Sequence, residues 1–179
     1  IAILMALVLT AGFAACGNTA TKTEDNAGSV SDSDVLKVGM ECNYAPYNWS
    51  QADDSNGAVP IKNVDNMYTN GYDVQVALKI AEALGKELVI QNMDFDAVCL
   101  SVSQQKCDIA MAGLTINEER QEYVTFTDSY YQASQRLIVP SADTTFDECK
   151  TADEVAAKLG ELSSSDKIGV QAGTTGQYY

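Results

Sequence analysis

The chain has 179 residues, 46% of them hydrophobic, which is enough apolar material for one sizeable core or for one lobe and part of another. Its formal net charge is −14, which argues against a nucleic-acid partner because such a partner requires a basic face. The chain contains no histidine, and this excludes His-dependent catalytic triads and His-ligated zinc.

The first residues have the composition of a targeting segment. Residues 1–15 carry no charge, are mostly apolar and end in small residues directly before Cys16. This stretch is too short for a transmembrane helix, and we interpret it as the remnant of a signal peptide. Because the pattern is similar to a bacterial lipoprotein signal, Cys16 is the predicted lipidation site, and an ordinary secretory peptide is the alternative. Two acyl chains on this cysteine would form a stable membrane anchor.

The segment behind the anchor is predicted to be a flexible linker. Residues 16–34 are rich in Asn, Thr, Ser, Asp and Gly and contain almost no large apolar side chain. Such a composition cannot bury enough apolar surface to order the chain.

An apolar strand is predicted at 36–40, followed by an elaborated surface hairpin over 50–70, where turn residues occur without a clear period. The hairpin contains Asp53 and Asp54, a pair that suggests calcium. No EF-hand spacing follows them, so we expect no metal site there.

Helices and strands then alternate along the chain. The first helix, 73–84, has one apolar stripe and ends at Gly85, which is placed to cap it. The elements expected after it are a strand at 88–91, a helix at 96–104, a strand at 108–112, a short helix at 117–123 and a strand at 136–139. A capping box at 151–154 opens a helix that ends near Gly160, and a further strand is expected at 168–170. Such alternation predicts an α/β sheet with ligands at the carboxyl ends of its strands.

Arg120 occupies the third position of the short helix that Asn117 is expected to cap. Its guanidinium can fork onto a carboxylate, while Gly113 lets a ligand approach the backbone and the Thr115 hydroxyl can supply a further hydrogen bond. The alternative is a surface arginine paired with a nearby acid, for which the candidates are Glu118, Glu119 and Asp128.

The segment 108–131 (DIAMAGLTINEERQEYVTFTDSYY) resembles the signature of the extracellular solute-binding proteins of polar amino-acid ABC transporters, family 3. Four other segments resemble parts of the same family in the same order: 36–49, 71–85, 95–108 and 167–179. The resemblance implies a two-lobed α/β fold of the type II periplasmic-binding-protein class. Residues 35–140 would form a nearly complete ligand-binding lobe 1, and residues 141–179 the crossover and the start of lobe 2. We therefore expect the natural protein to begin before Ile1 and to continue past Tyr179.

The resemblance also assigns roles to individual residues. Arg120 would clamp the α-carboxylate of an amino acid, and Gly113 and Thr115 would contact its α-ammonium and carboxylate groups. Thr174 and Thr175, at the start of a helix in the second lobe, would add amide contacts to the same carboxylate.

Three further positions match residues that surround the ligand side chain in this family. Tyr44 would stack on it, Phe95 would form an apolar wall, and Glu41 would pair with a cationic group, which favours a polar or cationic amino acid. Glu41 could equally point into solvent. Tyr47 and Trp49 either line the rim of the site or pack within the protein.

The function implied is the capture of a free amino acid and its delivery to an ABC transporter permease, without catalysis and without a cofactor. The protein would be a monomer held by its lipid anchor on the outer face of the cytoplasmic membrane. The alternatives are a cyclohexadienyl dehydratase-like enzyme on the same fold and the ectodomain of a sensor.

The remaining cysteines, Cys42, Cys99, Cys107 and Cys149, match no zinc or CxxC redox spacing. In an exported protein a disulfide is possible, and Cys99 and Cys107 are the nearest pair in the sequence. Burial of these cysteines as small hydrophobic residues is at least as well supported.

Overall fold

The computed structural model describes residues 32–178. The predicted signal-peptide remnant at 1–15, the lipidation site Cys16 and most of the predicted linker lie outside the described residues. The last linker residues, Asp32–Asp34, form an exposed 3-10 turn, η1, directly before the first strand.

The centre of the fold is a parallel three-stranded sheet in the order β6-β1-β7. The middle strand, β1 (Val35–Met40), pairs over its whole length with β6 (Glu87–Asn92) and more briefly with β7 (Ile109–Ala110). The prediction of strands at 36–40 and 88–91 is confirmed, and the strand expected at 108–112 is shorter than predicted.

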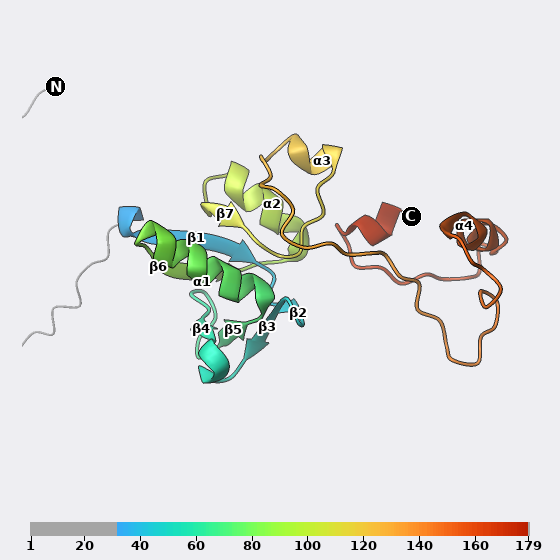
Figure 1. The fold of residues 1–179 in the computed structure, drawn as a ribbon, viewed down its shortest axis with the longest axis horizontal. Coiled ribbons are helices and arrows are strands. Elements are labelled where there is room, and N and C mark those ends of the chain that lie inside the picture. Colours follow the sequence, from blue (N-terminus) through green and yellow to red (C-terminus); the bar gives the residue numbers. More distant parts are fainter. Residues whose placement is uncertain (1–31, 179) are drawn as a thin grey trace, which may run out of the picture. The chain divides into compact units, whose positions relative to one another are not determined.

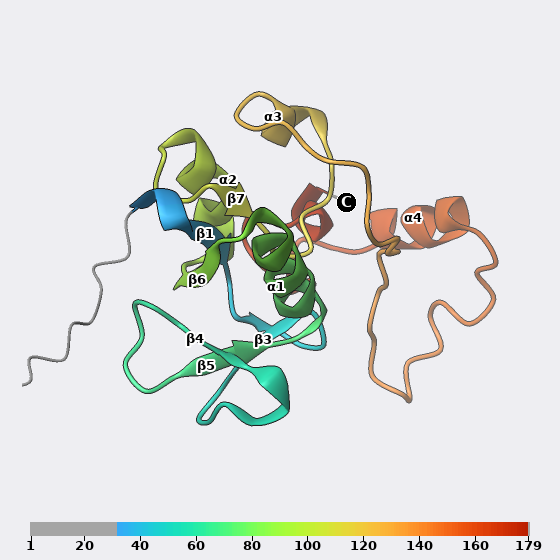
Figure 2. The same ribbon diagram turned by 60° about the vertical axis from the view of Figure 1, so that its left-hand side comes forward.

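Two helices cover this sheet, as Figures 1 and 2 show: α1 (Tyr72–Leu84) packs on β6 and β1, and α2 (Phe95–Ser103) packs on β1 and β7. The chain crosses from β1 to β6 through α1 and returns to β7 through α2. The first crossover moves the chain toward the β6 edge of the sheet, and the second moves it toward the β7 edge. Because both crossovers of such parallel strands are right-handed, the two helices lie on opposite faces of the sheet. Both helices occupy the predicted segments, and Gly85 caps α1 in the left-handed conformation with φ +64°.

Alternation along β1 divides its side chains between the two helices. Val38 and Met40 are fully buried in the main core, which α1 closes with Val74 and Ala77. Gly39 faces the other way, where a β-carbon would lie 2.8 Å from the Ser101 hydroxyl of α2. The core is therefore built almost entirely from the segment 35–111.

The hairpin predicted over 50–70 is confirmed as part of a four-stranded antiparallel sheet with the order β2-β3-β5-β4. Its strands are β2 (Asn43–Tyr44), β3 (Asn48–Gln51), β4 (Val59–Pro60) and β5 (Tyr68–Asn70), with a 3-10 turn, η2 (Ser55–Gly57), at its tip. No group of acidic or cysteine side chains in residues 32–178 is arranged to hold a metal ion.

Three further elements follow: α3 (Glu118–Gln121), α4 (Ala152–Gly160) and the 3-10 helix η3 (Thr175–Tyr178). The predicted capping box of α4 is confirmed, because Thr151 and Glu154 each bond the other's backbone amide. None of the helices over residues 32–178 has the length and apolar character needed to cross a membrane.

Two predicted strands are wrong. Residues 136–139 and 168–170 have no strand structure, and Ile138 and Ile168 are 92% and 54% exposed. An apolar run forms a strand only where a neighbouring strand takes up its backbone hydrogen bonds. Over the described residues, both sheets are made from strands between Val35 and Ala110, and none of those strands pairs with either run.

All four described cysteines are free thiols, so the alternative of a disulfide between Cys99 and Cys107 is not realised. Cys42, Cys99 and Cys107 are buried, which confirms their interpretation as small hydrophobic residues, whereas Cys149 is only partly buried.

Candidate ligand-binding site

Arg120 is held by the cap of its own short helix. The Asn117 side chain accepts a hydrogen bond from the Arg120 backbone amide over 2.8 Å, as the sequence predicted. The guanidinium is drawn back toward the loop before the helix, where Nη1 donates to the Thr115 carbonyl oxygen at 2.8 Å. Nη2 donates to the Gly173 carbonyl oxygen at 2.9 Å, and the group lies over the Phe95 ring, 5.4 Å from its centroid. The two hydrogen bonds to the Thr115 and Gly173 carbonyl oxygens fix the direction of the remaining N–H donors of Arg120.

The charge of this guanidinium is buried and pairs with no carboxylate of the described residues. Arg120 is only 9% exposed, and the ion pairs found in residues 32–178 join Lys37 to Asp32 and Lys158 to Glu161. The alternative of a surface arginine paired with Glu118, Glu119 or Asp128 is therefore wrong. Glu119 instead bonds the Tyr178 hydroxyl, and this contact is the main reason that the pKa of Tyr178 is raised. A buried cation beside two neutral carbonyl groups favours an anion from outside the chain.

A cavity of about 200 Å³ lies against this arginine, lined by Phe95, Asp96, Cys99, Leu100, Leu114, Asn117, Glu119, Arg120, Tyr123, Gly173 and Tyr178. Burial raises the pKa of the Cys99 thiol, and the positive charge of Arg120 opposes this effect.

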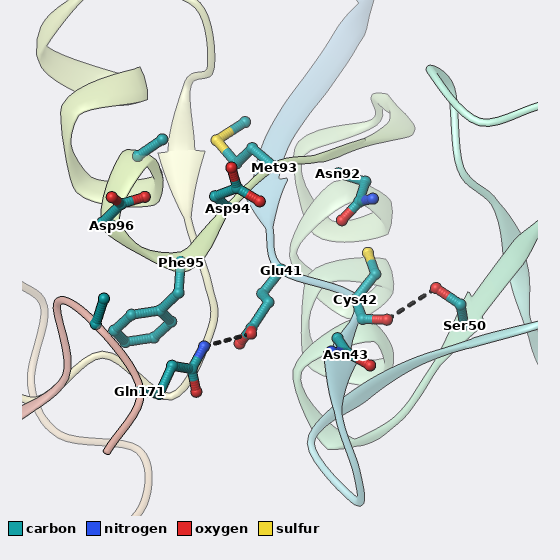
Figure 3. A pocket seen from close by; sticks show the side chains of 12 residues that line it. Glu41, Cys42, Asn43, Ser50, Asn92, Met93, Asp94, Phe95, Asp96 and Gln171 are labelled. Atoms are coloured by element: carbon teal, nitrogen blue, oxygen red, sulfur yellow. Dashed lines mark hydrogen bonds between the residues drawn. The ribbon is translucent and has the colours of Figure 1, made fainter. Parts of the chain in front are cut away.

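A second, larger cavity of about 880 Å³ also has Phe95 in its lining. Figure 3 shows its acidic side chains, Glu41, Asp94 and Asp96, around the Phe95 ring. Glu41 is partly exposed and accepts a hydrogen bond from the Gln171 side chain. Phe95 and Asp96 line both cavities, so the cavity beside the arginine and the larger acidic cavity share these two side chains.

Cys42 lies on the wall of the larger cavity as well. Burial raises the pKa of its thiol to about 11, so the thiol stays protonated at neutral pH and is a poor nucleophile. Cys42 therefore helps to shape the cavity wall and is not expected to react with a ligand.

Tyr44 and Gly113 meet near the ends of β1 and β7. Gly113 has φ +61°, and a β-carbon at this position would lie 3.3 Å from the Tyr44 ring, so a glycine allows this close approach. Tyr44 is 46% exposed and stacks on Tyr47 with 5.0 Å between ring centroids. Trp49 lies apart from both cavities and donates to Gln51 within the hairpin, which fits the packing alternative for this residue.

Thr174 and Thr175 lie at the start of η3, as predicted for a turn that opens a helix. Their side chains are occupied locally: the Thr174 hydroxyl donates to the Gln171 carbonyl oxygen, and the Thr175 hydroxyl accepts from Gln135. Neither residue lines either of the two cavities described above, but the preceding Gly173 packs against Asp96, with its β-carbon position 3.0 Å from the Asp96 β-carbon.

Sequence reasoning missed Asp94, Asp96 and Gln171, which line the larger cavity. The acids could have been found from their position at the start of a helix that follows a strand, where the carboxyl end of a parallel sheet opens. No local signal marks Gln171, because its contact with Glu41 spans 130 positions of the sequence.

The sequence of this chain is similar to a known family of proteins. The model of bacterial extracellular solute-binding proteins, family 3, matches residues 36–170. The arginine-binding extracellular protein ArtP of Bacillus subtilis is 28% identical over 162 residues, which cover 89% of this chain and 55% of ArtP. A probable histidine-binding protein of Campylobacter jejuni is 31% identical over 161 residues, covering 89% of this chain and 52% of that protein. The chain thus spans about half the length of the curated relatives it matches.

Among solved structures, the arginine-bound form of truncated ArgBP from T. maritima is 33% identical and covers 55% of this chain and 41% of that chain, with a TM-score of 0.45.

Ligands of parallel α/β sheets bind at the carboxyl ends of the strands, and the two cavities beside Phe95 and the buried Arg120 suit such a ligand-binding domain. The chain belongs to the bacterial extracellular solute-binding proteins, family 3. It has the mixed α/β fold of the type II periplasmic binding proteins, as the sequence predicted.

Proposed function

We propose that this chain is the ligand-capturing part of an amino-acid-binding protein that serves an ABC transporter and holds its ligand through the α-carboxylate at Arg120. The observation that carries the proposal is the buried guanidinium without an acidic partner among the described residues. A guanidinium has five N–H donors, and the carbonyl groups of Thr115 and Gly173 use two of its nitrogens. An ionised carboxylate is a stronger acceptor than a neutral carbonyl, so a ligand competes well for this group.

The remaining backbone contacts come from segments already close to Arg120. Gly113 is exposed and presents backbone beside Tyr44, and Thr115 follows it on the same loop. Thr174 and Thr175 follow Gly173, whose carbonyl group already reaches the guanidinium. We assign Gly113 and Thr115 to the α-ammonium and carboxylate groups, and the amides of Thr174 and Thr175 to the carboxylate. The Thr174 amide donates to the Gln171 carbonyl oxygen at 3.3 Å and would exchange this partner for the ligand.

The ligand side chain would extend past Phe95 toward Glu41. An acidic space without a lysine or arginine in its lining favours a cationic group there. The relatives named for arginine and histidine binding agree with this choice of ligand class.

In the complete protein, residues 35–140 would form lobe 1, and residues 141–179 would begin lobe 2. Ligand binding would favour the closed arrangement of the lobes, because that arrangement adds contacts from the second lobe. The closed protein, anchored through lipid on Cys16, would present its cargo to a permease. We propose binding without chemistry, because the two proteins compared above are both named for binding.

A ligand screen tests the α-carboxylate assignment. The complete gene product is expected to be stabilised against thermal unfolding by one or a few free amino acids, preferably cationic ones, and not by their α-amides. An amino acid at 100 times its dissociation constant should add about 2.7 kcal/mol to the free energy of unfolding. Equal stabilisation by the α-amide would contradict capture through the carboxylate, and a flat response to all common amino acids would contradict amino-acid binding.

Glu41→Gln tests whether residue 41 recognises a positive charge on the ligand side chain. The substitution keeps the shape of residue 41 and removes its charge, so affinity for a cationic amino acid should fall by about fivefold, as expected for a partly exposed ion pair worth about 1 kcal/mol. Affinity for a neutral polar amino acid should change little. Glu148→Gln, at an exposed position, is the matched control. Equal losses for both ligand types would show that Glu41 does not read charge.

A further inference from the structure

Asp73 is a fully buried carboxylate at the start of α1 that the proposed ligand contacts do not use. Its Oδ2 atom accepts a hydrogen bond from the Asn48 side-chain amide at 2.9 Å. Its Oδ1 atom accepts one from the Tyr130 hydroxyl, also at 2.9 Å. The carboxylate therefore joins α1 to β3 and to the chain that follows α3.

The same helix start holds the loop that directly follows Tyr44. The backbone amide of Tyr72 donates to the Pro46 carbonyl oxygen at 3.1 Å, and that of Asp73 donates to the Tyr47 carbonyl oxygen at 2.9 Å. These bonds use the unpaired amides at a helix N-terminus to fix a loop rather than to hold an anion.

Asn48 transmits this restraint to Tyr44, because the two residues are cross-strand partners in the β2–β3 pair. The Tyr44 ring in turn lies against Gly113. The Gly113 backbone amide lowers the pKa of both the Asp73 carboxyl group and the Tyr130 hydroxyl group, against the effect of burial.

Tyr130 is restrained on its other side as well. Its carbonyl oxygen accepts from the Tyr72 hydroxyl at 3.2 Å, and the ring of its neighbour Tyr131 meets the Tyr47 ring edge-on at 5.1 Å. Tyr47 stacks on Tyr44, so the contact of Tyr131 with Tyr47 also restrains Tyr44, the aromatic residue assigned to the ligand side chain.

We propose that Asp73 and Tyr130 are positioning residues that hold Tyr44 and the Gly113 backbone in the geometry needed for ligand binding. The inference rests on the proposed amino-acid binding, and it adds two residues that do not touch the ligand. The carboxylate serves this role better than an apolar residue because it accepts from several donors that belong to different segments.

Protonation of Asp73 gives the inference a measurable consequence. Burial raises the pKa of Asp73, and the hydrogen bonds from Asn48, Tyr130 and the Gly113 amide oppose this effect. The titratable groups that face it are Tyr130, whose pKa burial raises, and Tyr47, whose pKa rises to about 12 mainly through its bond with Tyr131. Both phenols stay neutral in the acid range, so Asp73 titrates there alone within this network. Its protonated form accepts fewer hydrogen bonds and holds the segments less firmly.

The first test needs no ligand. In the complete gene product labelled with ¹⁵N, the Gly113 amide resonance should shift as the pH is lowered from about 8 to about 4, through the raised pKa of Asp73. Asp73→Asn should abolish this shift, and Tyr130→Phe should change the resonance at neutral pH. If neither substitution changes the Gly113 resonance or its pH dependence, the inference is overturned, whichever ligand the protein binds.

The second test measures affinity. Tyr130→Phe keeps the ring and removes only the hydroxyl, and it should weaken amino-acid binding by about fivefold to tenfold, as for a lost buried hydrogen-bond partner. Tyr68→Phe, at a tyrosine of β5, should leave affinity unchanged. Affinity of the wild type should fall on acidification more steeply than that of Asp73→Asn.

The outcomes separate the two proposals. Tyr130→Phe that lowers the melting temperature but leaves affinity intact would overturn the positioning role. A wild type that binds no amino acid contradicts the proposed function, while a Gly113 resonance that follows Asp73 would still support the coupling.

Discussion

Replacing Arg120 with alanine in the complete gene product is expected to weaken amino-acid binding by about 100-fold or more. Truncating one partner of a buried, hydrogen-bonded charge pair costs about 2–5 kcal/mol, and each 1.4 kcal/mol is a factor of ten in the dissociation constant. The loss should be large here because the carboxylate would be left in a buried place without another cation from the cavity lining. Isothermal titration calorimetry with the ligand found by the screen measures it directly.

The chain offers a matched control. Arg136 is exposed, and Arg136→Ala should leave both affinity and stability unchanged. Arg120→Lys keeps the charge and loses the planar fork, so an intermediate loss is expected. Since Arg120 also lies over Phe95, thermal unfolding of each variant must show that the domain still folds. An affinity for Arg120→Ala equal to that of the wild type would defeat the carboxylate clamp.

The elements that the sequence predicted well are those defined by local chemistry. The stripe of α1, its Gly85 cap and the Asn117 and Thr151 caps each depend on residues within one or two turns. Hydrophobic periodicity and capping act over that same range, so a single sequence is enough to find them. The placement of Arg120 on a capped turn was predictable for the same reason.

What the sequence could not supply are contacts between segments that are distant along the chain. The Gly173 carbonyl that meets Arg120 lies 53 positions away, and the Tyr130 hydroxyl that meets Asp73 lies 57 positions away. The runs at 136–139 and 168–170 failed as strands for a related reason, since strand formation depends on a neighbour and not on composition alone. Nothing in the sequence marks Asp73 as buried, because aspartates are mostly exposed in folded proteins.

Replacing Gly71 with alanine is expected to lower the free energy of unfolding by more than about 3 kcal/mol. Gly71 has φ +132° and ψ 177°, a region essentially closed to residues with a β-carbon. An added β-carbon would lie 2.2 Å from the Tyr47 carbonyl oxygen, so the backbone itself would have to move. That movement would break the amide bonds from the start of α1 to the Pro46 and Tyr47 carbonyl groups. Urea denaturation followed by circular dichroism measures the loss.

Alanine substitutions at two other glycines distinguish the cost of backbone strain from the cost of the steric clash. Gly85 also has a positive φ, +64°, but no atom lies within 4 Å of its β-carbon position, so Gly85→Ala should cost only about 1–2 kcal/mol. Gly160 combines ordinary backbone with open space, and Gly160→Ala should be neutral or stabilising by about 0.5–1 kcal/mol. The clash at Gly71 should therefore make its variant the least stable of the three. If Gly71→Ala proved no worse than Gly85→Ala, the loop of Tyr47 would not be pressed against α1, and the restraint on Tyr44 would need another source.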